Sequence, residues 1–77
     1  MARIRFFAAA EEAAGAAELT RAETTLGALR AALTAEFAAL GDILPRCAVL
    51  VDGARAGDET PLAAGTLVDV LPPFAGG

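Results

Sequence analysis

The sequence predicts an α+β domain in which a mixed β-sheet packs against one main helix. Three patterns predict this fold: an alternating apolar segment near the N-terminus, an apolar stripe at helical spacing, and β-rich segments in the second half. Hydrophobic residues form 56% of the 77 residues, which favours a folded core over disorder. A chain of this length leaves no room for a second core. We therefore expect a single domain over residues 1–77 that ends in a flexible Gly-Gly tail, residues 72–77.

The first strand is predicted from residues 3–7, in which arginine alternates with apolar residues. Ile4 and Phe6 share one side of this strand and are expected to face the core. The alanine- and glutamate-rich residues 8–15 then predict a short helical turn. Gly15 is suited to end that turn because glycine adopts the left-handed conformation without a steric cost.

A weaker β pattern over residues 17–23 precedes the clearest helix, which is predicted for residues 24–41. Thr24 or Thr25 can accept a hydrogen bond from a first-turn amide and so cap the start. Apolar residues at three- and four-residue steps form one stripe, made of Leu26, Leu29, Leu33, Phe37 and Leu40. Gly41 is expected to end the helix.

The second half of the sequence predicts three strands, over residues 47–51, 54–56 and 66–71. Asp52-Gly53 is a strong signal for a two-residue hairpin turn because both residues tolerate positive φ. The prolines at positions 72 and 73 lack amide donors, so the last strand must end before them. We expect the first and last strands to be parallel neighbours at the sheet centre, with the helix as their crossover. This element order is the outline of the β-grasp, or ubiquitin-like, fold.

Composition excludes several classes of partner. The net charge is −4, and all six basic residues are arginines, which argues against binding to nucleic acid or to an anionic membrane. The N-terminus lacks the apolar run of a signal peptide, and no stretch is long enough to span a membrane, so we expect a cytoplasmic protein. The single cysteine, Cys47, excludes an internal disulfide and is interpreted as a small buried hydrophobe.

The sequence contains few residues that could catalyse a reaction, and the remaining candidate reactive group is at the C-terminus. There is no histidine or lysine, no phosphate-binding loop and no CxxC motif, and no metal site is expected. Gly76 and Gly77 have no side chains and could enter a narrow channel. The terminal carboxylate of Gly77 could attack an activated phosphate to form an acyl-adenylate, which a sulfur donor converts to a thiocarboxylate. Pro72 and Pro73 would keep the preceding segment extended.

Four segments carry a resemblance to a known family. They are RIRFFAAAEEAAG at residues 3–15, TTLGALRAAL at residues 24–33, VLVDG at residues 49–53 and DETPLAAGTLVDVLPPFAGG at residues 58–77. Together they resemble the small, sulfur-carrying subunit of molybdopterin synthase along nearly the whole chain. The proline pair before the final glycines is the most discriminating feature, because sulfur carriers of the thiamin pathway usually lack it.

The resemblance implies a sulfur carrier that is not an enzyme by itself. Gly77 would be adenylylated by a ubiquitin-activating-like enzyme that uses ATP and magnesium, so the carrier itself binds no cofactor. A sulfurtransferase would then supply the sulfur of the thiocarboxylate. The tail would insert into the large synthase subunit and donate sulfur to a pterin precursor, within a heterotetramer of two small and two large subunits.

The resemblance also implies the partner-binding positions, which are Phe7, Leu71, Pro73 and Phe74. Arg55 departs from the family pattern, because members often carry an apolar residue there. Three alternative functions stay open. The protein could be a sister sulfur carrier for cysteine or thiamin synthesis, a ubiquitin-like modifier whose Gly77 forms an isopeptide bond, or a plain interaction domain.

Overall fold

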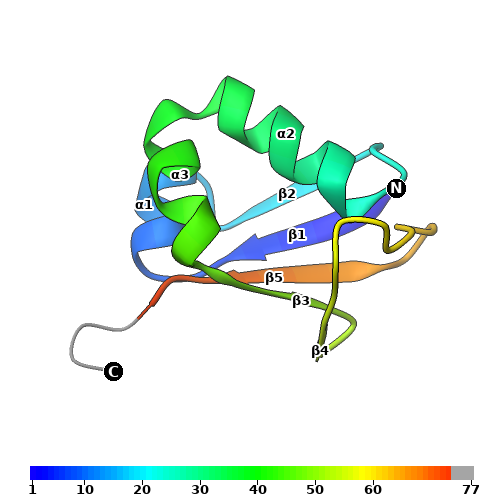
Figure 1. Cartoon of the computed structure of the whole chain (residues 1–77). Coiled ribbons are helices and arrows are strands. Elements are labelled where there is room, and N and C mark those ends of the chain that lie inside the picture. The colour runs from blue at the N-terminus through cyan, green and yellow to red at the C-terminus, as the bar shows by residue number, and fades with distance from the viewer. Residues whose placement is uncertain (74–77) are drawn as a thin grey trace.

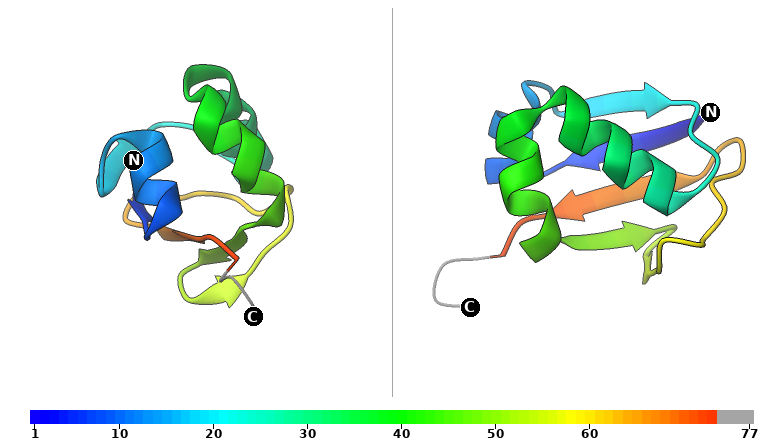
Figure 2. Two further views of the ribbon diagram at one scale, coloured as in Figure 1. Left: turned by 90° about the vertical axis from the view of Figure 1, so that its left-hand side faces the viewer. Right: turned by 45° about the horizontal axis from the view of Figure 1, so that its top comes forward.

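A computed structural model describes residues 1–73 as a five-stranded mixed sheet with helices on one face (Figure 1). The elements are β1 (Ala2–Phe6), α1 (Ala9–Ala14), β2 (Glu18–Arg21), α2 (Leu26–Glu36), α3 (Ala38–Ile43), a 3₁₀ turn η1 (Leu44–Arg46), β3 (Ala48–Val51), β4 (Ala54–Arg55) and β5 (Leu67–Leu71). The strand order is β2-β1-β5-β3-β4. Figure 2 shows α2 lying across one face of this sheet. The predicted α+β fold with a mixed sheet is confirmed.

The centre of the sheet is built from the first and last strands, which run parallel as predicted. Ile4 of β1 is aligned with Val68 of β5, and Phe6 is aligned with Val70. The side chains of Ile4 and Val68 are both 0% exposed. β2 flanks this pair on the β1 side and β3 flanks it on the β5 side, both antiparallel. The core therefore lies between the central strands and the helices.

The start of the long helix follows the sequence prediction. Thr25 is the N-cap residue, and its Oγ1 accepts a hydrogen bond from the Ala28 amide at 3.2 Å. Leu26, Leu29 and Leu33 are buried on the face that meets the sheet. The short first helix is also confirmed, since Gly15 caps α1 with a φ of 73°.

The predicted end of the long helix is wrong. Phe37 adopts an extended conformation, with φ −128° and ψ 93°, and divides the predicted helix into α2 and α3. Gly41 lies inside α3 rather than ending a helix. A Cβ atom at this position would be only 2.8 Å from Cγ2 of Thr34, so the close contact requires a glycine. The glycine thus permits close packing of α3 against α2, and this turn buries Leu40 in the same core.

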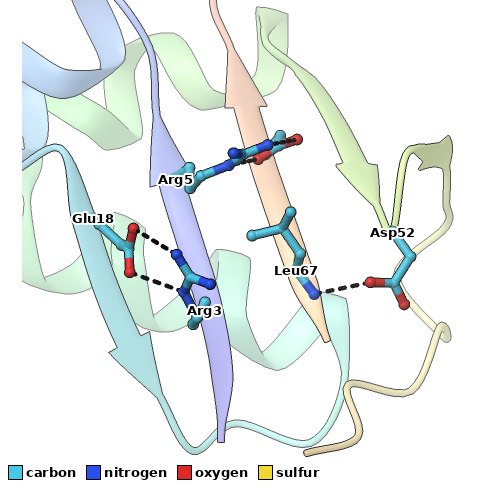
Figure 3. Close-up of polar contacts among 6 residues, drawn as sticks. Arg3, Arg5, Glu18, Asp52 and Leu67 are labelled. Atoms are coloured by element: carbon cyan, nitrogen blue, oxygen red, sulfur yellow. Dashed lines mark hydrogen bonds and ion pairs between the residues drawn. The ribbon is translucent and has the colours of Figure 1, made fainter. Parts of the chain in front are cut away.

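The hairpin and the end of the last strand agree with the sequence prediction. Asp52 and Gly53 both have positive φ, of 49° and 85°, as a two-residue hairpin requires. The Asp52 side chain also accepts a hydrogen bond from the amide of Leu67 at 3.0 Å, which ties the hairpin to the start of β5 (Figure 3). β5 ends at Leu71, directly before the two prolines. The chain therefore leaves the sheet at its central strand.

Candidate functional site

The face of the sheet opposite the helices carries the side chains that could meet a partner. Residues in β1 and β5 alternate between buried and more exposed positions, and the buried ones belong to the core. The register aligns the outward residues Arg3 with Leu67, and Arg5 with Asp69. Leu71, at the end of β5, shares this outward face because it lies two residues beyond Asp69. We call this surface the open face.

Two bidentate ion pairs cross the open face (Figure 3). Arg3 donates from Nε and Nη2 to the two carboxylate oxygens of Glu18, at 2.9 and 3.0 Å. Arg5 donates in the same way to Asp69, at 2.7 and 3.0 Å. The hydrogen bonds from Arg3 hold the pKa of Glu18 below its ordinary value. Because these pairs are near the surface, they contribute little to stability, but the fork geometry fixes the arginine heads.

Arg5 also determines the surroundings of Phe7. The guanidinium carbon Cζ of Arg5 lies 5.6 Å from the centroid of the Phe7 ring. The Phe7 amide donates to the Val70 carbonyl at 3.2 Å, which keeps the chain beside β5 one residue beyond the end of β1. Phe7 is 37% exposed, whereas the Asp69 side chain that anchors Arg5 is only 13% exposed. A partly buried carboxylate thus orients an arginine over an exposed aromatic ring.

Replacing Asp69 by asparagine should release Arg5 from Phe7. The amide is uncharged and offers one acceptor oxygen in place of two, so the bidentate pair is lost, and the Arg5 head becomes mobile and moves away from the ring. We expect the ring-current shift of the Arg5 side-chain protons to disappear in the NMR spectrum, with a loss of stability below about 1 kcal/mol. Glu18→Gln is the matched control and should leave the Arg5 resonances unchanged. Unaltered Arg5 shifts in Asp69→Asn would contradict this arrangement.

The open face ends at the tail root, which we define as Leu71, Pro72 and Pro73. Leu71 is half-buried, Pro72 is buried and Pro73 is exposed. Because β1 and β5 are parallel neighbours, the two strands end at the same edge of the sheet (Figure 1). Phe7 follows the last residue of β1 and Leu71 is the last residue of β5, so both lie at this end. The structure thus brings together three of the predicted partner-binding residues.

The remaining predicted site residues are Phe74, Gly76 and Gly77, and they lie outside the described residues. Their proposed roles in partner binding, tail insertion and adenylylation therefore stay predictions.

A groove of about 550 Å³ borders the tail root. Its lining residues are Pro45, Arg46, Cys47, Ala48, Arg55 and the three residues of the tail root. Arg46 was not among the predicted site residues, and Arg55 was predicted only to depart from a family pattern. Neither residue could be placed beside Pro73 from the sequence, because their proximity depends on the pairing of β3 with β5.

Cys47 is not an activated nucleophile. It is partly buried, and its Sγ donates to the carbonyl of Ile43 at 3.3 Å. Burial raises the pKa of the thiol, although the positive charges of Arg30 and Arg46 oppose this effect. The thiol therefore stays protonated at neutral pH, in agreement with its interpretation as a small hydrophobe.

The described residues contain no cluster of side chains that would suit a metal ion. Within residues 1–73, no group of three or more histidine, cysteine, aspartate or glutamate side chains could hold a metal ion. The same part of the chain has no helix that is long and apolar enough to cross a membrane.

Comparison with known proteins identifies related sequences and folds. A sequence model of the ThiS family matches residues 4–77 of the chain. None of the curated proteins compared with the chain matches it significantly.

Several solved structures are similar to this one over nearly their whole length. SAMP1, a small archaeal modifier protein from Haloferax volcanii, is 25% identical, with a TM-score of 0.82 over 99% of this chain and 98% of that chain. The HVO 2177 protein of the same organism is 31% identical, with a TM-score of 0.80 over 99% and 85%. A chain in the complex of subunits 1 and 2 of molybdopterin-converting factor from Helicobacter pylori is 27% identical, with a TM-score of 0.74 over 99% and 97%. The predicted ubiquitin-like β-grasp fold is thereby confirmed.

Proposed function

The chain belongs to the ThiS family of ubiquitin-like sulfur carriers, and from this premise we propose that it supplies sulfur for molybdopterin synthesis. The carrier's reactive group is the terminal carboxylate of Gly77. The observation that supports this function best is the convergence of Phe7, Leu71 and Pro73 beside the point where the chain leaves the sheet. Such an apolar surface at the start of the tail is suited to a protein that must accept the tail itself.

The chemistry requires no catalytic side chain of this protein. An oxygen of the Gly77 carboxylate attacks the α-phosphorus of ATP, and pyrophosphate leaves. A sulfur nucleophile then attacks the carbonyl carbon of the acyl-adenylate, AMP leaves, and a thiocarboxylate remains. The thiocarboxylate sulfur then attacks an electrophilic carbon of a pterin precursor to form a thioester. Water hydrolyses this thioester, which leaves the sulfur on the pterin and returns the Gly77 carboxylate. The absence of side chains at Gly76 and Gly77 lets the carbonyl carbon reach the reaction centre of each partner in turn.

The proposed partners follow from these steps. A ubiquitin-activating-like adenylyltransferase supplies ATP and magnesium, and a sulfurtransferase supplies the sulfur. The large subunit of molybdopterin synthase accepts the tail, in a heterotetramer of two small and two large subunits. The likeness to a chain of the Helicobacter pylori complex supports a large-subunit partner. Arg55 stands where family members often carry an apolar residue, so the contacts beside the tail root differ in detail. These reactions are expected in the cytoplasm.

Intact-mass spectrometry can test the proposed function directly. The full chain is incubated with an activating enzyme, ATP, magnesium and a sulfide source. Its mass should increase by the difference between one sulfur and one oxygen atom, and the C-terminal peptide should carry the increase. Adding the large subunit and the cyclic pterin phosphate should then restore the original mass and yield the dithiolene product. A thiocarboxylated chain that transfers no sulfur to the pterin would favour a sister carrier of cysteine or thiamin synthesis.

The second candidate function is a protein modifier. The similarity to SAMP1, which is named as a small archaeal modifier protein, supports this alternative. In this case the activated Gly77 would form an isopeptide bond with a lysine of another protein. The chain has no lysine, so it could not form lysine-linked chains on itself. Covalent conjugates in place of a free thiocarboxylate would favour the modifier.

A further inference from the structure

The six arginines of this acidic chain differ in whether they form ion pairs. Four of the six make ion pairs within residues 1–73. They are Arg3 with Glu18, Arg5 with Asp69, Arg21 with Glu23 and Glu36, and Arg30 with Asp58. Arg46 and Arg55 make no ion pair in that part of the chain. Among the arginines of the described residues, the charges without an ion pair are therefore at these two positions.

Arg46 and Arg55 border the same hollow of the surface. Both line the groove of about 550 Å³ at the tail root. A second depression, of about 330 Å³, is lined by Arg30 and Arg55 and extends to Gly57. The two depressions share Cys47, Ala48 and Arg55, so they adjoin at these residues, and we call them together the arginine groove. None of the described residues that line it is acidic.

The sheet topology explains why this groove is open. β4 has only two residues, and they pair with Leu50 and Val51 of β3. Ala48 and Val49 therefore have no strand partner on that side within the described residues. The chain from Arg55 to Gly57 diverges from β3, and the groove lies between them. An opening along an unpaired strand edge suits an extended peptide segment better than a compact ligand.

The charge of the groove is consistent with an acidic occupant. Arg46 lines the groove at the tail root and Arg30 lines the second depression, so positive charge borders both parts of the groove. The charge of Arg30 is partly neutralised by Asp58, whose Oδ1 lies 3.1 Å from the arginine Nε. This contact is an ion pair but not a hydrogen bond. Within residues 1–73, Arg46 and Arg55 make no ion pair, so their guanidinium groups can bind carboxylates of a partner in a bidentate manner.

We propose that the arginine groove binds an extended, acidic segment of the protein that receives the C-terminal tail. The proposal rests on the proposed function, because the groove begins at Pro73 and an occupant would lie beside the tail. Contacts at the tail-root end of the open face would hold the partner, and the arginines would select a partner with carboxylates at this position. They would also steer its approach, since opposite charges accelerate association.

An oligoglutamate peptide serves as the probe, with oligolysine as the negative control. Titrating the full ¹⁵N-labelled chain with oligoglutamate should shift the amide resonances of residues 46–49 and 55–57 most. The double variant Arg46→Ala/Arg55→Ala should bind the peptide at least about fivefold more weakly, as expected for the loss of two ion pairs near the surface. Its matched control is Ala28→Glu/Ala35→Glu on the exposed side of α2. The net charge of both variants is two units more negative than that of the parent chain.

Two outcomes would overturn the proposal. One is equal weakening in both double variants, since net charge alone would then account for binding. The other is a shift pattern centred on the open face around Arg3 and Arg5, or no shifts at all. A second measurement, thiocarboxylate formation at Gly77 detected by intact mass, distinguishes a failure of this proposal from a failure of the proposed function. A normal thiocarboxylate without groove binding overturns the groove alone, and groove binding without a thiocarboxylate overturns the sulfur-carrier function alone.

Discussion

Deleting Gly77 should reduce thiocarboxylate formation to background while the fold of the domain is retained. The terminal carboxylate would then belong to Gly76 and would lie closer to the body by one residue, about 3.3–3.6 Å of extended chain. A shift of this size moves the carboxylate oxygen away from the α-phosphorus of ATP, and reactions of this kind tolerate little misplacement. Intact mass after incubation with the activating enzyme, ATP and a sulfide source measures the effect.

Ala75→Gly is the control for the deletion. It changes the tail composition but keeps its length and its terminal glycine, so it should be thiocarboxylated as the parent is. Urea denaturation of the two variants should give the same midpoint as the parent chain, because the buried core lies within residues 2–70. Full thiocarboxylation of the truncated chain would refute the role of Gly77 as the reactive residue.

The sequence predicted those parts of the fold that depend on local patterns. Ile4 and Phe6 alternate with arginines, which identifies a half-buried strand, and Asp52-Gly53 identifies a hairpin turn. The end of the long helix could not be predicted in this way. Gly41 has the composition of a helix end, but its role depends on the close approach of Thr34 from another turn, which is a tertiary contact.

The candidate site could be predicted only in part, for a similar reason. Phe7 and Leu71 were expected at a common surface, and the parallel pairing of β1 and β5 brings them to one end of the sheet. The pairing of Arg5 with Asp69 could not be predicted, because the two residues are 64 positions apart and their alignment depends on strand register. The same holds for Arg46 and Arg55, whose proximity to the tail root requires the β3–β5 and β3–β4 pairings.

Replacing Leu71 by aspartate should weaken binding to the large synthase subunit by about 30-fold or more, the size expected for a central interface residue. Leu71 is half-buried, shares the open face with Asp69 and lines the groove at the tail root. A partner that covers this position would have to bury the new carboxylate, at a cost of several kcal/mol unless it is paired. Isothermal titration of the large subunit with each variant measures the change.

Leu67→Asp is the control, because it makes the same substitution at the other end of the same strand. Both leucines are half-buried, both belong to β5 and both face outward. They differ in that Leu67 begins the strand and Leu71 ends it, about 13 Å apart at 3.3 Å per residue. A partner that receives the tail must cover the tail root, whereas it need not reach the start of β5. We therefore expect Leu67→Asp to bind within about threefold of the parent, a change of less than 1 kcal/mol. Equal losses in the two variants would mean that the aspartate destabilises the sheet itself and that the tail root has no special role in docking.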